Sequence, residues 1–164
     1  VDREDLRPQK HKFISSREVP SVLNGKQDDY FIFTVIRNPW ERTVSYFHYL
    51  QQIRQPPNNL SKDVKFANWV RAGGFRTLQT QMSQLSDDFP CSVSRNIDYV
   101  ARLENLSEDW PKICKKMGIS CDMMHDKKSK HKHYSEYYNE VTKDIVYKFY
   151  KDDVQCLGYE FEKK

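Results

Sequence analysis

Long apolar runs are missing from this sequence. Its 164 residues are 38% hydrophobic with a mean hydropathy of −0.86, and no stretch approaches the roughly 18 consecutive apolar residues that mark a membrane-spanning helix. No signal peptide is visible and the first residue is Val1 rather than Met, so we expect either that a leader or anchor has been removed or that the sequence is a fragment. Aromatic residues reach 13%, and we expect the core of a single domain, residues 1–164, to be built largely from them.

Cysteine is scarce and lacks CxxC spacing. The four cysteines are Cys91, Cys114, Cys121 and Cys156. An even count permits two disulfides in three pairings and requires none. Cys114 and Cys121 lie near His125, His131 and His133, but their spacings match no zinc ribbon or zinc finger. We therefore expect buried thiols and loop histidines, and no metal.

Strong net charge is also absent, because the formal charge is only +4. The distribution of that charge is more informative than its size. Residues 127–133 contain four lysines and two histidines, namely Lys127, Lys128, Lys130, Lys132, His131 and His133. Such a run is either a solvated loop or a site for phosphate or another anion, and the lysines alone leave both readings open.

The order of the expected elements indicates an α/β domain. Residues 30–36 are β-favouring without alternation, which is typical of a strand buried on both faces of a parallel sheet. A second strand is expected at 97–103, and helices at about 15–23, 39–53, 64–71, 107–117 and 141–149, while residues 75–95 are ambiguous. Alternating strands and helices predict a layered α/β domain, in which ligands bind at the carboxyl ends of the strands.

Arg37 directly follows the first expected strand, and Ser45 lies eight residues later on the helix that leaves the turn. A guanidinium offers a planar fork to phosphate oxygens, and a serine hydroxyl can donate one more hydrogen bond. The start of a helix adds partial positive charge for an anion. The alternative is a local ion pair between Arg37 and Glu41, and the residues alone leave both open.

The stretch from Phe33 to Tyr49 resembles the 3′-phosphate-binding segment of sulfotransferases that use 3′-phosphoadenosine-5′-phosphosulfate (PAPS). In that segment an arginine ends a strand and a serine follows eight positions later. The residues from Arg37 to Ser45 are most similar to those of the carbohydrate sulfotransferases and their bacterial relatives. Further similar segments follow in family order: Lys10-His11, Ser16-Arg17-Glu18-Val19, Ala101-Arg102-Leu103-Glu104-Asn105-Leu106, Lys128-Ser129 through Tyr134, Tyr137 and Tyr138, Asp152-Asp153, and Leu157-Gly158-Tyr159-Glu160-Phe161. The resemblance thus covers about residues 10–161.

The resemblance implies a P-loop-NTPase-like three-layer domain with a central parallel sheet flanked by helices. It implies transfer of a sulfuryl group from PAPS to an acceptor hydroxyl, on a carbohydrate, with release of 3′-phosphoadenosine-5′-phosphate (PAP) and no metal. By position, the 3′-phosphate ligands are Arg37 and Ser45, and the loop ligands are Lys128, Ser129, Lys130 and Lys132. The candidate general base is His11, whose alternative is an exposed histidine in a basic segment. Glu104 is an alternative acid or base, but the resemblance implies a structural role for it. Residues 55–95 are expected to line the acceptor side, with Arg71, Arg76 and Gln81 as candidate contacts to sugar or sulfate.

One departure from the family pattern keeps an alternative open. The family begins with a strand and a Lys-Ser/Thr loop that grips the 5′-phosphosulfate, and Val1 to Lys10 contain no such loop. We expect truncation; the alternative is a non-catalytic module that binds PAP or polyanions. Binding of RNA or heparin through residues 127–133 ranks last, since no nucleic-acid motif is present. Relatives imply a Golgi lumen with an upstream membrane anchor in animals and a cytoplasmic protein in bacteria or viruses.

Overall fold

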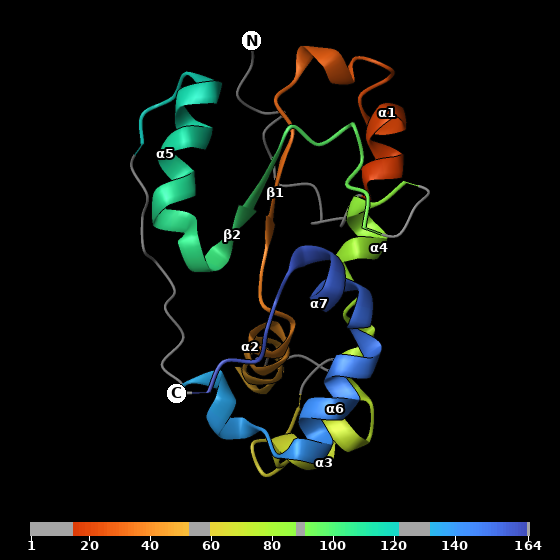
Figure 1. Cartoon of the computed structure of the whole chain (residues 1–164), viewed down its shortest axis with the longest axis vertical. Coiled ribbons are helices and arrows are strands. Elements are labelled where there is room, and N and C mark those ends of the chain that lie inside the picture. The colour runs from red at the N-terminus through yellow and green to blue at the C-terminus, as the bar shows by residue number, and fades with distance from the viewer. Residues whose placement is uncertain (1–14, 53–59, 88–90, 122–131, 164) are drawn as a thin grey trace.

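The computed structural model describes residues 15–52, 60–87, 91–121 and 132–163 (Figure 1). Its strands are β1 (Phe33–Ile36) and β2 (Tyr99–Arg102). Its α-helices are α1 (Val19–Val22), α2 (Pro39–Gln52), α3 (Phe66–Arg71), α4 (Gln81–Leu85), α5 (Leu106–Met117), α6 (Glu140–Phe149) and α7 (Lys151–Leu157). Short 3₁₀ turns are η2 (Ser16–Glu18), η3 (Gln27–Asp29), η4 (Gly74–Thr77), η5 (Leu103–Asn105) and η6 (Tyr134–Tyr137).

The two strands are parallel, with Phe33 opposite Tyr99 and Ile36 opposite Arg102. They therefore end side by side, and the predicted α/β class is confirmed. In Figure 1 the strands lie between α5 on one side and α1 with α4 on the other. The expectation that the first strand is buried on both faces is wrong for these residues, because Val35 is 42% exposed. Over the described residues the sheet has two strands, so one edge of β1 has no neighbouring strand.

Helix α5 is attached to β2 through one carboxylate. Asp109 accepts hydrogen bonds from the Tyr99 hydroxyl (2.8 Å) and the Arg102 N–H (3.1 Å). These two bonds, together with the nearby Lys112 ammonium, lower the pKa of Asp109. The helix ends at Gly118, whose φ of 66° is the left-handed conformation that glycine adopts readily. This stop is where the sequence predicted it.

Most of the buried apolar side chains gather under α2, α3 and α6, at one end of the molecule in Figure 1. We call this cluster the aromatic core; it consists of Trp40, Val44, Phe47, Phe66, Trp69, Val70, Phe75, Tyr134, Val146, Tyr150 and Val154. Phe75 is fully buried and meets Phe149 edge to face, with the ring centroids 5.3 Å apart. Gly74 lies so close to Trp69 that a Cβ there would be 2.1 Å from the indole Nε1. The expectation of a core rich in aromatic residues is confirmed.

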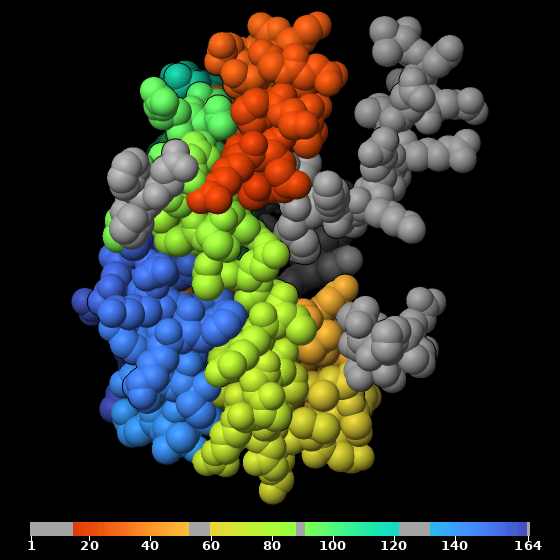
Figure 2. Space-filling model, turned by 90° about the vertical axis from the view of Figure 1, so that its right-hand side faces the viewer, coloured from red at the N-terminus to blue at the C-terminus, as the bar shows by residue number. Residues whose placement is uncertain are grey.

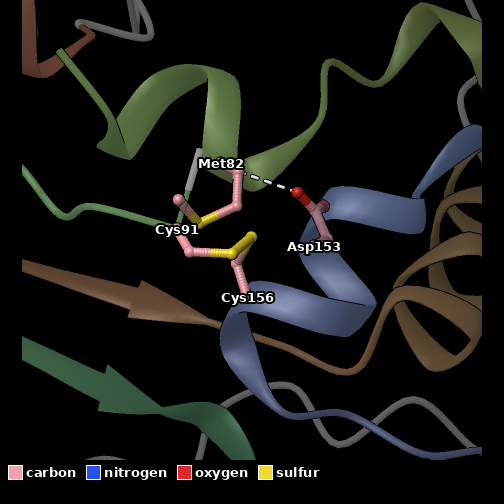
Figure 3. Close-up of a disulfide and its surroundings, with 4 residues drawn as sticks. All are labelled: Met82, Cys91, Asp153 and Cys156. Carbon is pink, nitrogen blue, oxygen red and sulfur yellow. Dashed lines mark hydrogen bonds between the residues drawn. A yellow bond between two sulfur atoms is a disulfide. The ribbon is translucent and has the colours of Figure 1, made fainter. Parts of the chain in front are cut away.

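Between the sheet and the aromatic core, α4 packs against α7. A disulfide joins Cys91, which lies beyond α4, to Cys156 of α7 (Figure 3). Asp153 lies three residues before Cys156, and both side chains project from α7 toward the α4 side. The other two cysteines are not in disulfides; Cys114 is buried and Cys121 is exposed. The structure thus has one disulfide where the sequence permitted two, and the expectation of a buried thiol is confirmed for Cys114 and wrong for Cys121.

The N-terminal described segment closes over α4. Ser15 and Glu18 form a capping box, in which the Ser15 N–H donates to the Glu18 carboxylate at 2.9 Å. The Ser16 hydroxyl donates to Asp87 beyond α4 at 3.0 Å. Figure 2 shows this segment and α1 in red-orange, α4 in yellow-green and the C-terminal helices in blue, adjoining on one face. Asn24 and Gly25 then reverse the chain with positive φ, as the sequence predicted.

Candidate functional site

Arg37 is the first residue after β1, and its main chain is held by a side chain 44 residues away. The Arg37 N–H donates to the Gln81 Oε1 at 2.8 Å, and the Arg37 carbonyl accepts from the Gln81 Nε2 at 2.8 Å. A side-chain amide that donates and accepts at once replaces the peptide that a neighbouring strand would supply. Gln81 is buried, with 7% of its surface exposed, so solvent hardly competes for either bond.

The next residue, Asn38, is fixed by hydrogen bonds of both its main chain and its side chain. Its N–H donates to the Glu104 carboxylate at 2.5 Å, and its side-chain oxygen accepts from the Trp40 N–H at 3.0 Å. Its side-chain nitrogen donates to the carbonyl of Glu160 at 3.0 Å. Asn38 therefore caps α2 and holds the C-terminal segment. Because Asn38 already occupies the first free N–H of α2, an anion at this helix start could take that N–H only by displacing Asn38.

The guanidinium of Arg37 is only partly satisfied. Its Nη2 lies 3.0 Å from the Glu41 Oε1, and the two side chains are 20% and 29% exposed. Its Nε is buried and has no hydrogen-bond partner among the described residues. The alternative of a local ion pair is confirmed, but one donor of the guanidinium stays open for another acceptor. A buried N–H without a partner is costly, so a ligand oxygen there would be favourable.

Ser45, the second predicted 3′-phosphate ligand, lies on α2. Residues four apart are neighbours on a helix, so Ser45 lies one turn after Glu41 on the same face of α2. Ser45 is half-buried. Arg37 precedes the helix, and its guanidinium reaches this face through its contact with the Glu41 carboxylate.

A cavity of about 480 Å³ opens at the carboxyl ends of both strands. Its lining is polar, and its charged residues are mainly acidic: Asn38, Glu41, Arg102, Glu104, Asn105, His133, Tyr134, Gly158, Tyr159, Glu160 and Glu162. The lining contains four carboxylates and one guanidinium, so the cavity favours hydroxyl or ammonium groups over phosphate.

Glu104 organises one wall of this cavity. One carboxylate oxygen accepts from the Asn38 N–H, and the other accepts from the Tyr159 hydroxyl at 3.4 Å. Burial and the nearby Glu104 carboxylate raise the pKa of Tyr159, so its hydroxyl stays protonated and donates. Arg102 donates to the carbonyl of Leu157 and lies 4.6 Å from the Tyr159 ring centre. Glu104 thus joins the end of β1 to the C-terminal segment, in agreement with the structural role that the resemblance implies.

Behind Gln81 lies Asp153, which is fully buried. Its carboxylate accepts from the main-chain N–H of Met82 at 2.7 Å (Figure 3). It also accepts from the main-chain N–H of Gln81 at 2.8 Å and lies 3.5 Å from the Gln81 Nε2. Burial raises the pKa of Asp153, while these hydrogen bonds lower it less strongly. We call Arg37, Asn38, Gln81, Glu104 and Asp153 the strand-end network.

The remaining predicted site residues are scattered or not described. His11, Lys128, Ser129 and Lys130 lie outside the described residues. Lys132 is exposed and lies 3.8 Å from Glu136. Arg71 ends α3 and is exposed, while Arg76 in η4 lies 5.9 Å from the Phe149 ring centre. Of the three candidate acceptor contacts, the structure brings only Gln81 to the strand ends, and there its amide binds the main chain of Arg37.

Sequence reasoning missed the role of Asp153, although it noted Asp152-Asp153 within the resemblance. Its partners lie 71 and 72 residues away, so no local pattern could reveal it. Over the described ranges, no group of three or more His, Cys, Asp or Glu side chains could hold a metal ion. No helix in those ranges is long and apolar enough to span a membrane.

Known proteins are similar to this chain to different degrees. An uncharacterized protein from Archaeoglobus fulgidus is 28% identical over 92 residues, which is 56% of this chain and 71% of that protein. No solved structure matches the chain. A profile of the sulfotransferase family matches residues 2–160. Because that match spans nearly the whole chain, β1, Arg37, α2 and the C-terminal segment all lie inside it, and the protein belongs to the sulfotransferase family.

Proposed function

We propose that the protein transfers a sulfuryl group from PAPS to an acceptor hydroxyl, and that Arg37 and Ser45 hold the 3′-phosphate of the donor. The observation that carries this proposal is the position of Arg37: it follows β1 directly, its main chain is bound by Gln81, and its guanidinium contacts Glu41, one helical turn before Ser45 on α2. Membership of the sulfotransferase family supports sulfuryl transfer in general.

The chemistry of the guanidinium suits a phosphate. Arginine donates from a planar fork, which matches two phosphate oxygens at once. The buried Nε of Arg37 has a free donor among the described residues. Binding of a dianionic phosphate would compensate the guanidinium more strongly than the single Glu41 carboxylate does at 3.0 Å. Ser45, two helical turns after Arg37, would donate its hydroxyl to the same phosphate.

The predicted loop ligands and base complete the scheme. Lys128, Ser129, Lys130 and Lys132 would add contacts to the 3′-phosphate or the ribose. His11 would take the proton of the acceptor hydroxyl as its oxygen bonds to sulfur. The bond between sulfur and the bridging phosphate oxygen breaks in the same displacement, and PAP leaves with the electron pair. We also propose that the complete protein has the three-layer, P-loop-like arrangement around a larger parallel sheet.

A carbohydrate is the proposed acceptor. The strand-end cavity supports this choice because carboxylates accept hydrogen bonds from sugar hydroxyls, and Glu41, Glu104 and Glu160 line it beside Tyr134 and Tyr159. Its volume of about 480 Å³ lies in the range of small-molecule sites. The Cys91–Cys156 disulfide supports action in an oxidising compartment, such as a secretory lumen.

Calorimetric titration of PAP and of adenosine 5′-phosphate (AMP) tests the phosphate site. PAP should bind more tightly than AMP, and Arg37→Ala should remove most of that preference, since a charge-assisted hydrogen bond contributes about 1.5–3 kcal/mol. Ser45→Ala should weaken the binding of PAP by a smaller factor than Arg37→Ala does. Arg17→Ala, which removes an exposed arginine on η2, is the charge-matched control and should bind as the wild type does. Equal affinity for PAP and AMP in the wild type would contradict the proposal.

A further inference from the structure

Gln81 uses its whole side-chain amide to bind the main chain of Arg37. Both polar atoms of its amide bind the two main-chain groups of one residue, each at 2.8 Å. In a parallel sheet a neighbouring strand binds alternate residues in this paired manner. β1 ends at Ile36, so Gln81 binds the first residue after the strand in the way that a neighbouring strand would.

Asp153 fixes which way the Gln81 amide points. An amide can be turned so that its oxygen and nitrogen exchange places. The Asp153 Oδ2 lies 3.5 Å from the Gln81 Nε2 and accepts from the Gln81 N–H at 2.8 Å. A carboxylate in this place favours the NH₂ end and would repel the oxygen end. The amide oxygen therefore faces the Arg37 N–H, which needs an acceptor.

We propose that Gln81 is a positioning residue for Arg37, anchored by Asp153, and that it acts on the 3′-phosphate through the direction of the guanidinium. This inference rests on the proposed function, in which Arg37 binds that phosphate. The main chain of Arg37 sets where its Cβ points, and the fork must meet the phosphate oxygens within narrow angles. Gln81 itself touches no ligand in this account.

The neighbouring bonds make this role specific to Gln81. Glu104 binds the Asn38 N–H, which lies on the same peptide as the Arg37 carbonyl, so it helps to hold that peptide but leaves the Arg37 N–H to Gln81. Thr80 caps α4 by accepting from the Ser83 N–H at 3.2 Å and makes no bond to Arg37. Loss of the Thr80 cap should therefore weaken the same short helix while it leaves the Arg37 peptide bound.

A double-mutant cycle between Gln81 and Arg37, measured by titration of PAP and AMP, tests the inference. Gln81→Met keeps the side-chain volume and removes both hydrogen bonds. It should weaken the binding of PAP about tenfold and leave the binding of AMP nearly unchanged. When Arg37 is already replaced by Ala, the Gln81 substitution should have almost no further effect on either affinity. Thr80→Ala is the matched control for α4 and should leave the ratio of the PAP and AMP affinities unchanged.

Gln81→Asn provides a milder second variant. It keeps the amide but is one methylene shorter, so it cannot reach both main-chain groups of Arg37, and it should lower the PAP preference as Gln81→Met does. Thermal unfolding of each variant checks that it is folded at the titration temperature. Failure of both substitutions to change the ratio, while Arg37→Ala abolishes it, would overturn the positioning role and leave the phosphate site standing. No effect of Arg37→Ala would overturn both.

Discussion

The aromatic core and the strand-end network differ in what holds their side chains in place. In the aromatic core, rings from α2, α3 and α6 meet at centroid distances of about 5–6 Å, and several of these pairs are edge to face. In the strand-end network, Gln81, Glu104 and Asp153 bind main-chain groups 44 to 72 residues away through bonds of 2.5–2.8 Å. One region is held by apolar contact and the other by directed hydrogen bonds.

The difference separates stability from ligand preference. Apolar burial depends on area and tolerates small shifts in direction. A hydrogen bond between buried groups weakens steeply with angle, so it fixes geometry even where its net free energy is small. We therefore expect substitutions in the aromatic core to change mainly the free energy of unfolding. Substitutions in the strand-end network should also change the discrimination between PAP and AMP.

The largest expected effect is on stability, from Phe75→Ala. Phe75 is fully buried against Phe149 and Tyr150, and loss of a buried phenyl ring costs about 3–5 kcal/mol. Urea titration should show this loss, while the PAP to AMP ratio of the folded fraction stays at the wild-type value. Tyr49→Ala removes a 58% exposed ring as a control. A changed PAP to AMP affinity ratio in Phe75→Ala would contradict the claim that the aromatic core affects stability but not ligand preference.

Removal of the disulfide should come next. Cys91 and Cys156 are 65 residues apart, and loss of a native disulfide costs about 2–5 kcal/mol. We expect the double substitution of both cysteines by serine to lower the unfolding free energy by this amount. Cys121→Ser, at an exposed free thiol, is the control and should have no effect. An unchanged unfolding free energy in the double variant under oxidising conditions would contradict the pairing.

Asp153→Asn should change both the free energy of unfolding and the preference for PAP over AMP. It replaces one acceptor of the buried carboxylate by a donor facing a main-chain N–H, at a cost of about 1–3 kcal/mol, and it frees the Gln81 amide to turn. We expect a lower unfolding free energy together with a lower PAP preference. Thr142→Val, at another fully buried polar side chain, should lower stability alone. If Asp153→Asn loses stability but keeps its preference for PAP over AMP, Asp153 does not help to position Arg37.

The stability difference between wild type and Asp153→Asn should also depend on pH. Burial raises the pKa of Asp153 above its ordinary 3.8, so the folded state binds the proton more tightly than the unfolded state does. The wild type should therefore gain stability relative to Asp153→Asn as pH falls through the raised pKa toward 3.8. Denaturant titrations from pH 7 to pH 4 measure this difference. A difference that shrinks on acidification would contradict the burial argument.

The smallest expected effect is from Glu41→Gln. Glu41 pairs with Arg37 at 3.0 Å in a partly exposed position, and such a pair contributes about 0–1 kcal/mol. Its removal should free the guanidinium for the ligand and tighten PAP by roughly two- to fivefold, with AMP unchanged. Weaker PAP binding in this variant would mean that Glu41 orients Arg37 rather than competes with the phosphate.

The sequence predicted the parts of this fold that local patterns determine. The helices expected at 39–53 and 107–117 are present as α2 and α5, each within about one residue of the expected bounds. The strand at 30–36 was correct in type but too long, and the expectation that both of its faces are buried was wrong because Val35 is 42% exposed.

The strand-end network was beyond local reasoning. Arg37 could be singled out because it follows a run of β-favouring residues, and Glu41 because it lies one helical turn later. Gln81 was noted as a guess for a sugar contact, since no spacing links it to a main chain 44 residues away. The same holds for the bond between Asn38 and Glu104, 66 residues apart. Tertiary packing alone brings these groups together.

A crystal structure of the chain with PAP tests the central claim most directly. The account predicts that the 3′-phosphate lies within hydrogen-bond distance of the Arg37 guanidinium and the Ser45 hydroxyl, with Gln81 still bound to the Arg37 main chain. A nucleotide bound elsewhere, with Arg37 paired only to Glu41 as it is here, would contradict it.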